Sequence, residues 1–326
     1  MTKLNNQEVD MEVGVVGLGL MGSSIVVALL LSGQKVIGVA PVASDLAHAE
    51  KNMRAILVDC AKASPLQYPV EWYMQRLTLT EAYAALANCR LVMECVLEKA
   101  AIKASVYDKI EAVVSRHTVI ASNTSAIPIS DLQRTVLFPD RFVGVHWAEP
   151  AFATRFLEIT CGKQTDPAYA EWVVGLSAQW EKEPTVLKKD IRGFITNRLM
   201  YAVYRELFHL VETGKTTIED ADKAFRYDAG AWITLMGIFR RMDYTGLEDG
   251  GVMLRNIIPT LSNTGRVPVA MQQILEKGGR GTQNQVGLYS YSVAEARLWE
   301  ESFAKFNREI YQLAARYPLR KQQVDV

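Results

Sequence analysis

The segment EVGVVGLGLMGSSIVVALLLSGQKVIGV, residues 12–39, sets the fold of the first half of the chain. Residues 12–16 form a short apolar run and predict a buried strand, and the glycine-rich sequence GLGLMG follows at once. Residues 23–31 are apolar almost throughout and predict a buried helix, after which residues 35–39 predict a second strand. A strand, a glycine turn, a helix and a strand in this order are typical of a parallel sheet that is covered by helices.

GLGLMG is a GxGxxG sequence between a predicted strand and a predicted helix, which is the setting that this motif requires. Gly17 allows a tight turn, Gly19 lets a phosphate approach the backbone, and Gly22 lets the helix pack closely. The free amides at the start of the helix favour a negative charge. The motif therefore predicts a dinucleotide site formed by Gly17, Leu18, Gly19, Leu20, Met21 and Gly22.

The end of the second predicted strand lacks an acidic residue. NAD-binding units usually carry Asp or Glu there to bind the adenosine ribose hydroxyls, whereas this chain has Ala40, followed by Pro41. No Arg or Lys stands close behind to hold the 2′-phosphate of NADP, since the next basic residues are Lys51 and Arg54. We expect NAD as the cofactor, held loosely at its adenosine, with NADP as the alternative.

The composition is that of a soluble globular protein, and 326 residues suit about two domains. Lys+Arg and Asp+Glu both number 36, so no basic surplus indicates nucleic acid or a membrane as a partner. The four cysteines have no CxxC spacing and no histidine cluster beside them, which indicates a reducing compartment and no metal site. The first ten residues are polar, and the longest apolar run, 25–31, is far shorter than the about 20 residues of a membrane span. We therefore expect a cytoplasmic protein.

Two further predicted strands end in polar residues. A buried strand over 89–96 is followed by Glu98 and Lys103, and a strand over 118–122 is followed by Asn123, Thr124 and Ser125. In open α/β sheets the loops at the carboxyl ends of the strands hold the ligand. Hydroxyl and amide side chains there suit a substrate oxygen or a nicotinamide. An ordinary turn that leads into the next helix is an equal alternative from these residues alone.

A histidine ends the apolar run of VGVHWAEP, residues 143–150, and a glutamate follows it twelve residues later. Two neighbouring strands would set His146 against Glu158, giving an imidazole that moves a proton and a carboxylate that orients the ring. The alternative is a core histidine beside an unrelated surface glutamate, and histidine is common enough in cores for both interpretations to stay open here.

The chain resembles the 3-hydroxyacyl-CoA dehydrogenase family, including its short-chain 3-hydroxybutyryl-CoA branch and its relatives that do not use CoA. The resemblance covers residues 12–291 and depends on the order and spacing of five stretches. These are GLGLMG from Gly17, MECVLE from Met93, ASNTS from Ala121, VHWAEP from Val145 and GFITNRL from Gly193. It implies a Rossmann-type doubly wound parallel sheet within a domain at 1–190, then an all-helical domain at 191–326 for substrate binding and dimerisation.

The resemblance also implies roles for the matching positions. His146 corresponds to the general base, and Glu158 to the carboxylate that orients it. Ser125 corresponds to the residue that hydrogen-bonds the substrate oxygen and the nicotinamide side. Asn197 corresponds to the residue that completes the substrate site from the second domain. We thus expect the catalytic set His146, Glu158, Ser125 and Asn197, with Glu98 and Lys103 near the cofactor ribose and the acyl-CoA.

The departures from the family pattern concern the ligands. Glu149 stands where the family has an Asn beside the nicotinamide, so its carboxylate is expected to repel an anionic substrate, to hold the cationic ring, or to turn outward. The pair Arg240-Arg241 enters a stretch that is usually less basic, which suits a carboxylate or phosphate or a solvated helix face. Thr282, Gln283 and Asn284 replace lysines near the end of the resemblance.

The sequence therefore predicts reversible NAD-dependent oxidation of a 3-hydroxyacyl-CoA to the 3-ketoacyl-CoA by a homodimer. One alternative keeps this chemistry on a free hydroxy acid, such as a gulonate- or carnitine-like compound, and the arginine pair favours it. The other alternative is a cofactor-binding protein without turnover, which the complete catalytic set argues against. The expected partner is a small molecule, not nucleic acid or a membrane.

Overall fold

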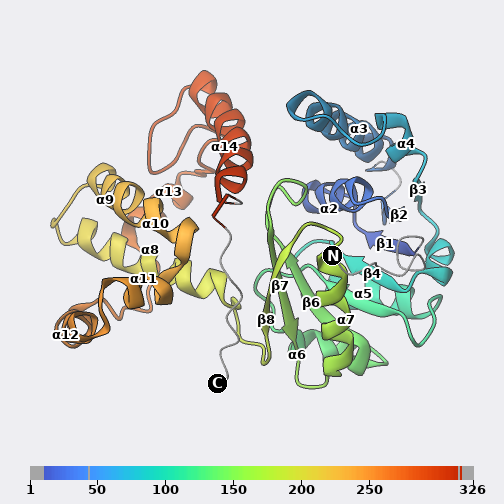
Figure 1. Cartoon of the computed structure of the whole chain (residues 1–326), viewed down its shortest axis with the longest axis horizontal. Helices are drawn as coiled ribbons and strands as arrows, with labels where there is room; N and C mark the ends of the chain where they lie inside the picture. The colour runs from blue at the N-terminus through green and yellow to red at the C-terminus, as the bar shows by residue number, and fades with distance from the viewer. Residues whose placement is uncertain (1–10, 43–44, 315, 318–326) are drawn as a thin grey trace. The chain divides into compact units, whose positions relative to one another are not determined.

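The computed structural model describes residues 11–42, 45–314 and 316–317 (Figure 1). The chain forms two compact units, which divide between Asn197 and Arg198. This division lies seven residues beyond the boundary expected at residue 190. Each unit is described below by itself.

The first unit contains one sheet with the strand order β3-β2-β1-β4-β5-β6-β7-β8 (Figure 1). The strands are β1 (Glu12–Val16), β2 (Lys35–Val39), β3 (Leu77–Thr80), β4 (Leu91–Glu94), β5 (Val119–Ser122), β6 (Phe142–Trp147), β7 (Phe156–Cys161) and β8 (Glu183–Leu187). All neighbours run parallel except β6 and β7, which pair antiparallel. The carboxyl ends of β1 to β6 therefore lie at one edge of the sheet, and this edge carries the loops that matter below.

Helices cover both faces of this sheet. They are α2 (Leu20–Leu31), α3 (Asp45–Ala63), α4 (Val70–Met74), α5 (Ala100–Glu111), α6 (Ile129–Leu132) and α7 (Pro167–Ser177), with short 3₁₀ turns at Tyr83–Asn88, Gln133–Thr135 and Pro139–Arg141. Val13 and Val15 of β1 pack in one buried cluster with α2, α3 and α7. Val16 packs in a second cluster with α5 and α6. Adjacent residues of a strand point to opposite faces, so these two clusters are the two layers of a doubly wound domain, and the predicted fold class is confirmed.

The second unit is helical and contains few buried side chains. Its helices are α8 (Thr196–Glu212, which begins in the first unit), α9 (Ile218–Ala224), α10 (Gly230–Met236), α11 (Ile238–Thr245), α12 (Leu247–Ile257), α13 (Val269–Glu276) and α14 (Val293–Ala314), with a π-helical turn at Phe225–Ala229 and a 3₁₀ turn at Ile258–Thr260. Among its described residues, the buried apolar side chains are only Ala221 and Ala296. Large apolar side chains such as Tyr201 and Phe239 are instead exposed.

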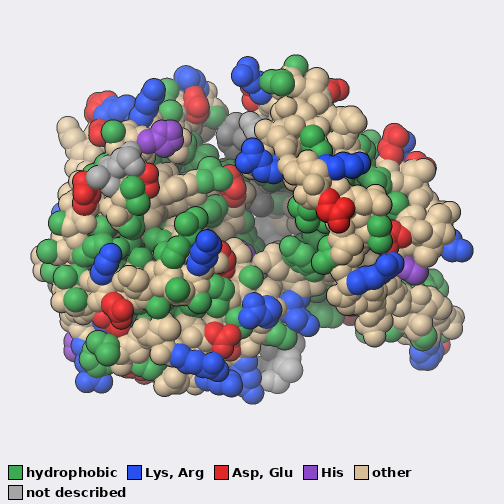
Figure 2. All heavy atoms as spheres, turned by 180° about the vertical axis from the view of Figure 1, so that it is seen from behind, with side chains coloured by type: hydrophobic (Ala, Val, Ile, Leu, Met, Phe, Trp, Pro, Cys, Tyr) green, Lys and Arg blue, Asp and Glu red, His purple; other side chains and the backbone are tan. Residues whose placement is uncertain are grey.

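Charges of both signs are interspersed on the surface seen in Figure 2, in keeping with their equal numbers in the sequence. Among the described residues, no helix is long and apolar enough to span a bilayer. Within the same residues, no group of three or more His, Cys, Asp or Glu side chains is placed to hold a metal ion.

Candidate active site

The glycine turn after β1 is tight and leaves open space at one position. Gly17 has a φ of 94°, and a Cβ there would lie 2.8 Å from the carbonyl oxygen of Cys95. A Cβ on Gly22 would lie only 1.8 Å from the carbonyl oxygen of Gly17. Around Gly19, by contrast, a Cβ would meet no atom within 4 Å. The first and third glycines are thus required by the protein's own packing, and the second borders free space.

The start of α2 is suited to an anion. Gly19 is its N-cap and offers no side chain to the first amides, which have no partner within the helix. No acidic residue occupies the first turn. The positive end of the helix dipole therefore faces the free space at Gly19, and the dinucleotide pyrophosphate fits there. Leu18, Leu20 and Met21 supply the intervening backbone.

Ala40 directly follows β2, as the sequence predicts, and its side chain is fully buried. Its amide donates to the carbonyl oxygen of Thr80 at 3.0 Å. The position thus brings no carboxylate to the place where a ribose acceptor usually stands.

A buried ionic network at the end of β4 was missed by the sequence reasoning. Glu94 is fully buried, and its Oε1 accepts hydrogen bonds from Lys103 Nζ at 2.7 Å and from the Val96 amide at 2.8 Å. Its Oε2 accepts from Tyr107 at 2.7 Å and from Ser122 at 2.8 Å. Burial, together with the Glu94 carboxylate, raises the pKa of Tyr107 well above its usual value. The available signal was an acidic residue that ends an otherwise apolar strand.

Glu98 connects this network to the loop after β5. Its Oε2 lies 3.2 Å from Lys103 Nζ, and its Oε1 accepts from the Thr124 hydroxyl and from the Ser125 amide, the latter at 3.1 Å. Burial alone would raise the pKa of Glu98, but the Thr124 hydrogen bond and the Lys103 charge hold it below its usual value. Lys103 is 1% exposed, and its ammonium group forms ion pairs with the carboxylates of both Glu94 and Glu98.

His146 and Glu158 are direct cross-strand partners on β6 and β7. His146 Nδ1 lies 3.2 Å from Glu158 Oε2, and the other oxygen, Oε1, accepts from the Ile195 amide at 2.7 Å. Glu158 is fully buried, which rules out the alternative of a surface glutamate. With Nδ1 directed at the carboxylate, the neutral ring keeps its proton there and presents Nε2 as the acceptor.

Aromatic rings enclose His146. The Phe156 ring lies 5.6 Å from it, edge to face, and the Phe194 ring lies 6.0 Å away. Phe194 is buried and has a φ of 49°, directly after Gly193 with a φ of 79°. This left-handed turn delivers the Ile195 amide to Glu158. The sequence identified the GFITNRL stretch but not this role of its backbone.

Ser125 and Asn197 are brought together. Asn197 Nδ2 donates to the carbonyl oxygen of Ser125 at 2.8 Å, and Ser125 itself is exposed. Thr124 accepts from the Ile127 amide at 3.0 Å, so the segment forms the ordinary turn that the sequence offered as one alternative, and its role toward a ligand stays a prediction. Asn197 is the last residue of the first compact unit and lies in α8, whose following residues belong to the helical unit.

Glu149 lies in the loop after β6 and is exposed. Among the described residues, no hydrogen bond or ion pair engages its side chain. Partial burial raises its pKa above the usual value. Its carboxylate is thus available to a ligand.

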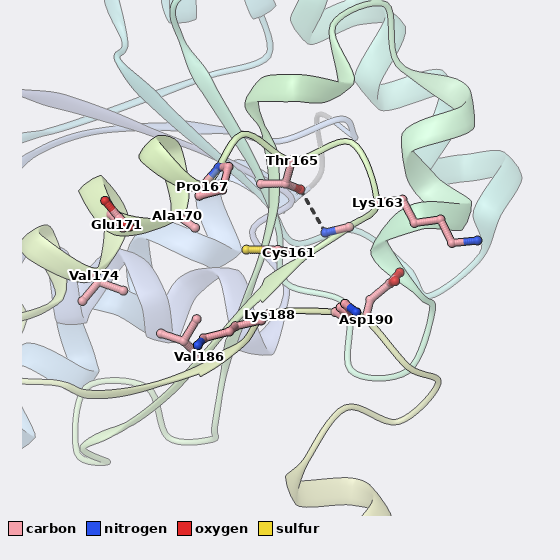
Figure 3. A pocket seen from close by; sticks show the side chains of 12 residues that line it. Cys161, Lys163, Thr165, Pro167, Ala170, Glu171, Val174, Val186, Lys188 and Asp190 are labelled. Atoms are coloured by element: carbon pink, nitrogen blue, oxygen red, sulfur yellow. Dashed lines mark hydrogen bonds between the residues drawn. The ribbon is translucent and has the colours of Figure 1, made fainter. Parts of the chain in front are cut away.

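The same unit contains a cavity of about 740 Å³ that none of these residues lines, and Figure 3 shows its lining side chains. It lies near the carboxyl end of β7 and is lined by Cys161, Lys163, Thr165, Val186, Lys188 and others. His146 does not line it. The pairing of His146 with Glu158 therefore follows from the strand register and not from this cavity.

The open glycine turn, the free helix start and the histidine–carboxylate pair at one sheet edge define a dinucleotide-dependent oxidoreductase. Residues 12–191 match the model of the 3-hydroxyacyl-CoA dehydrogenase NAD binding domain, and residues 193–291 match that of the C-terminal domain of the same enzymes. The chain belongs to the 3-hydroxyacyl-CoA dehydrogenase family and is an NAD-dependent dehydrogenase. The family and the cofactor predicted from the sequence are confirmed.

Several relatives act on different compounds. The chain is 28% identical to a 5-formyl-3-hydroxy-2-methylpyridine 4-carboxylate 5-dehydrogenase of Mesorhizobium japonicum, over 90% of this chain and 94% of the relative. It is 30% identical to an L-carnitine dehydrogenase of Bacillus cereus, over 97% of each chain. It is 31% identical to human mitochondrial hydroxyacyl-coenzyme A dehydrogenase, over 72% of this chain and 76% of that one. A solved structure of a 5-formyl-3-hydroxy-2-methylpyridine 4-carboxylic acid 5-dehydrogenase, described as an NAD+ dependent dismutase, superposes with a TM-score of 0.86 at 26% identity, covering 94% of this chain and 99% of that one.

Proposed function

We propose that the protein oxidises a carbon that bears a hydroxyl group, with His146 as the general base. The supporting observation is the pairing of His146 Nδ1 with Glu158 Oε2 at 3.2 Å, with Glu158 itself fixed by the Ile195 amide. A buried carboxylate with both oxygens engaged keeps the imidazole in one orientation and one tautomer.

NAD, when bound, supplies the hydride acceptor. At the substrate, the C–H bond breaks and its electron pair leaves with the hydrogen as hydride. The O–H proton passes to Nε2 of His146, and a carbonyl bond forms between the same carbon and oxygen. Glu158 stabilises the resulting imidazolium, because its carboxylate is held beside Nδ1 in a buried site. In the reverse direction His146 returns the proton.

We assign Ser125 to the substrate oxygen and Asn197 to the support of Ser125. The exposed Ser125 hydroxyl suits a hydrogen bond to the reacting oxygen, and Asn197 fixes the backbone that carries it. Glu98 serves the cofactor ribose, since it follows β4 at the ligand edge and is held by Lys103. We also assign Glu149 to the nicotinamide side, because a carboxylate there would favour the cationic, oxidised ring.

The proposed substrate is a free hydroxy acid of small size. CoA carries phosphates that require cations, and Lys103, the cation expected near it, is buried between two carboxylates. Two relatives that match nearly the whole chain are named for compounds without CoA. A hydrated aldehyde presents the same H–C–O–H unit as an alcohol, so an aldehyde belongs to the same reaction class.

The second candidate substrate is a 3-hydroxyacyl-CoA. The description of the family and the relationship to human hydroxyacyl-coenzyme A dehydrogenase support it. The two candidates separate in one assay, which follows NADH absorbance with 3-hydroxybutyryl-CoA and with a panel of free hydroxy acids and aromatic aldehydes. A kcat/KM at least tenfold higher for a free acid supports the first candidate, and the opposite ranking supports the second. Turnover with none of them, at full NAD binding, contradicts both.

We further propose that two copies of the helical unit associate. The side chains Tyr201, Phe239, Tyr244 and Trp299 are each more than half exposed in this unit, whose described core is very small. A helical domain that exposes so much apolar surface is stabilised when it packs against a second copy. Light scattering should give twice the mass of the chain, whereas a monomer at micromolar concentration contradicts this proposal.

A further inference from the structure

The loop at residues 148–155 joins the strand that carries His146 to the strand that carries Glu158. Its backbone is fixed from several sides. The Ala151 amide donates to Ser24 Oγ of α2 at 2.7 Å, and the Thr154 hydroxyl donates to the carbonyl oxygen of Ala148 at 3.3 Å. Ser24 lies in the helix whose first turn faces the pyrophosphate site. The loop is therefore packed between the cofactor helix and the acid–base pair.

Lys182 holds the same loop from the opposite side. Its Nζ donates to the carbonyl oxygen of Ala151 at 2.6 Å and also to that of Thr154. The ammonium group lies 5.3 Å from the centre of the Trp147 ring. Trp147 is the residue that directly follows His146 on β6. Lys182 is 7% exposed, and Ala151 and Thr154 are buried as well. The Lys182 ammonium group thus binds the carbonyl oxygens at both ends of the turn at residues 151–154.

The Glu181 carboxylate acts on the Lys182 ammonium at a longer range than an ion pair. Among the described residues, none forms an ion pair with it, although Glu181 is adjacent in sequence and Arg155 is a nearby cation. Glu181 adopts a left-handed φ of 55° in the turn before β8. The next residue, Lys182, has a buried side chain. A buried, unpaired cation is costly, and its hydrogen bonds to two carbonyl oxygens are the interactions that offset this cost.

We infer that Lys182 is a positioning residue for the dehydrogenase reaction, which holds the 148–155 loop and through Trp147 keeps His146 in register with Glu158. This inference rests on the proposed function of His146. Without the ammonium group, two buried carbonyl oxygens lose their donor, and the loop gains other conformations. Trp147, the last residue of β6 before the loop, loses its contact with the Lys182 ammonium group at the same time.

The test compares Lys182→Met, which keeps the length of the side chain but no donor, with Lys182→Arg, which keeps a cationic donor. Lys163→Met is the matched control, because Lys163 is an exposed lysine near the far end of β7. Amide hydrogen exchange is measured for peptides that cover 148–155, β1 and α2, and steady-state kinetics give kcat and KM separately.

For Lys182→Met we expect exchange in 148–155 to rise at least tenfold while β1 exchange is unchanged, and kcat to fall about 10- to 100-fold with KM within about threefold. Lys182→Arg should recover most of kcat, and Lys163→Met should behave like the unaltered enzyme. Faster exchange throughout the unit, or a loosened loop with unchanged kcat, overturns the inference. Failure of the unaltered enzyme to oxidise any substrate overturns the proposed function instead, and the exchange measurement still tests whether Lys182 holds the loop.

Discussion

Glu158 accepts a hydrogen bond from the backbone amide of Ile195 at 2.7 Å, across 37 residues of sequence. This bond occupies the carboxylate oxygen that does not face His146, so neither oxygen is free to turn away. The turn at Gly193 and Phe194 positions the Ile195 amide beside Glu158. It therefore belongs to the proposed acid–base site, although it contacts no reacting atom.

Replacing Glu158 by Gln tests this arrangement. The amide side chain has nearly the same shape, but it no longer stabilises an imidazolium and favours a different tautomer of His146. We expect kcat to fall about 10²- to 10⁴-fold. NADH affinity, measured by fluorescence titration, should stay within about threefold, and a kcat near that of the unaltered enzyme would remove Glu158 from the mechanism.

Replacing His146 by Ala removes the proposed proton acceptor. We expect turnover to be abolished at neutral pH while NAD affinity stays within a few-fold, because His146 lies on β6 and not in the glycine turn. Titration calorimetry with NAD is the control for folding. Retention of the original rate would exclude His146 as the base.

The glycine turn offers a matched pair of substitutions. Gly22→Ala places a Cβ 1.8 Å from the carbonyl oxygen of Gly17, so we expect a loss of about 3 kcal/mol or more in the free energy of unfolding. Gly19→Ala meets no protein atom within 4 Å, so the melting temperature should hardly change while NAD binding weakens about tenfold or more. Equal effects on stability from both variants would contradict this description of the turn.

The missing acid at the end of β2 can be restored with Ala40→Asp. The side chain of Ala40 is fully buried, so an unpaired carboxylate there should destabilise the protein without cofactor by about 1–3 kcal/mol. Bound NAD offers ribose hydroxyls to the same carboxylate, so NAD affinity should rise about tenfold. Thermal melts with and without saturating NAD measure both effects, and a variant that NAD stabilises no more than the unaltered protein speaks against the assignment of this position.

Lys182 should give a distinct pH dependence of stability. Burial lowers its pKa from 10.5 to about 8, with Glu181 acting to raise it and Arg155 to lower it. Below pH 8 the folded and unfolded chains are both charged, and the folded state bears the full cost of the buried charge. Between about pH 8 and 10.5 the folded chain loses the proton first, so its stability rises relative to Lys182→Met, by up to about 3 kcal/mol. Parallel curves for the two proteins in urea denaturation over this range would exclude the shift.

Sequence patterns within short segments predicted the glycine turn after β1 and the pairing of His146 with Glu158 on neighbouring strands. The 12–39 segment contains its own strand, turn and helix signals, and the run that ends at His146 is close enough to Glu158 for the two strands to pair. The contacts of Glu94 and Lys182 were not predicted. Lys182 reaches Ala151 across 31 residues, and Ala151 reaches Ser24 across 127. Such contacts depend on how helices and turns pack against one another. The spacing of apolar residues predicts helices and strands but does not predict this packing.

The antiparallel pairing of β6 with β7 also makes the proposed chemistry sensitive to chain length. Successive residues of a strand alternate between faces, so a shift of β7 by one position would carry Glu158 to the side of the sheet away from His146. The connection between β6 and β7 therefore tolerates an insertion or deletion that shifts β7 less well than loops elsewhere do, because such a chain can keep its architecture and still lose the pairing of His146 with Glu158.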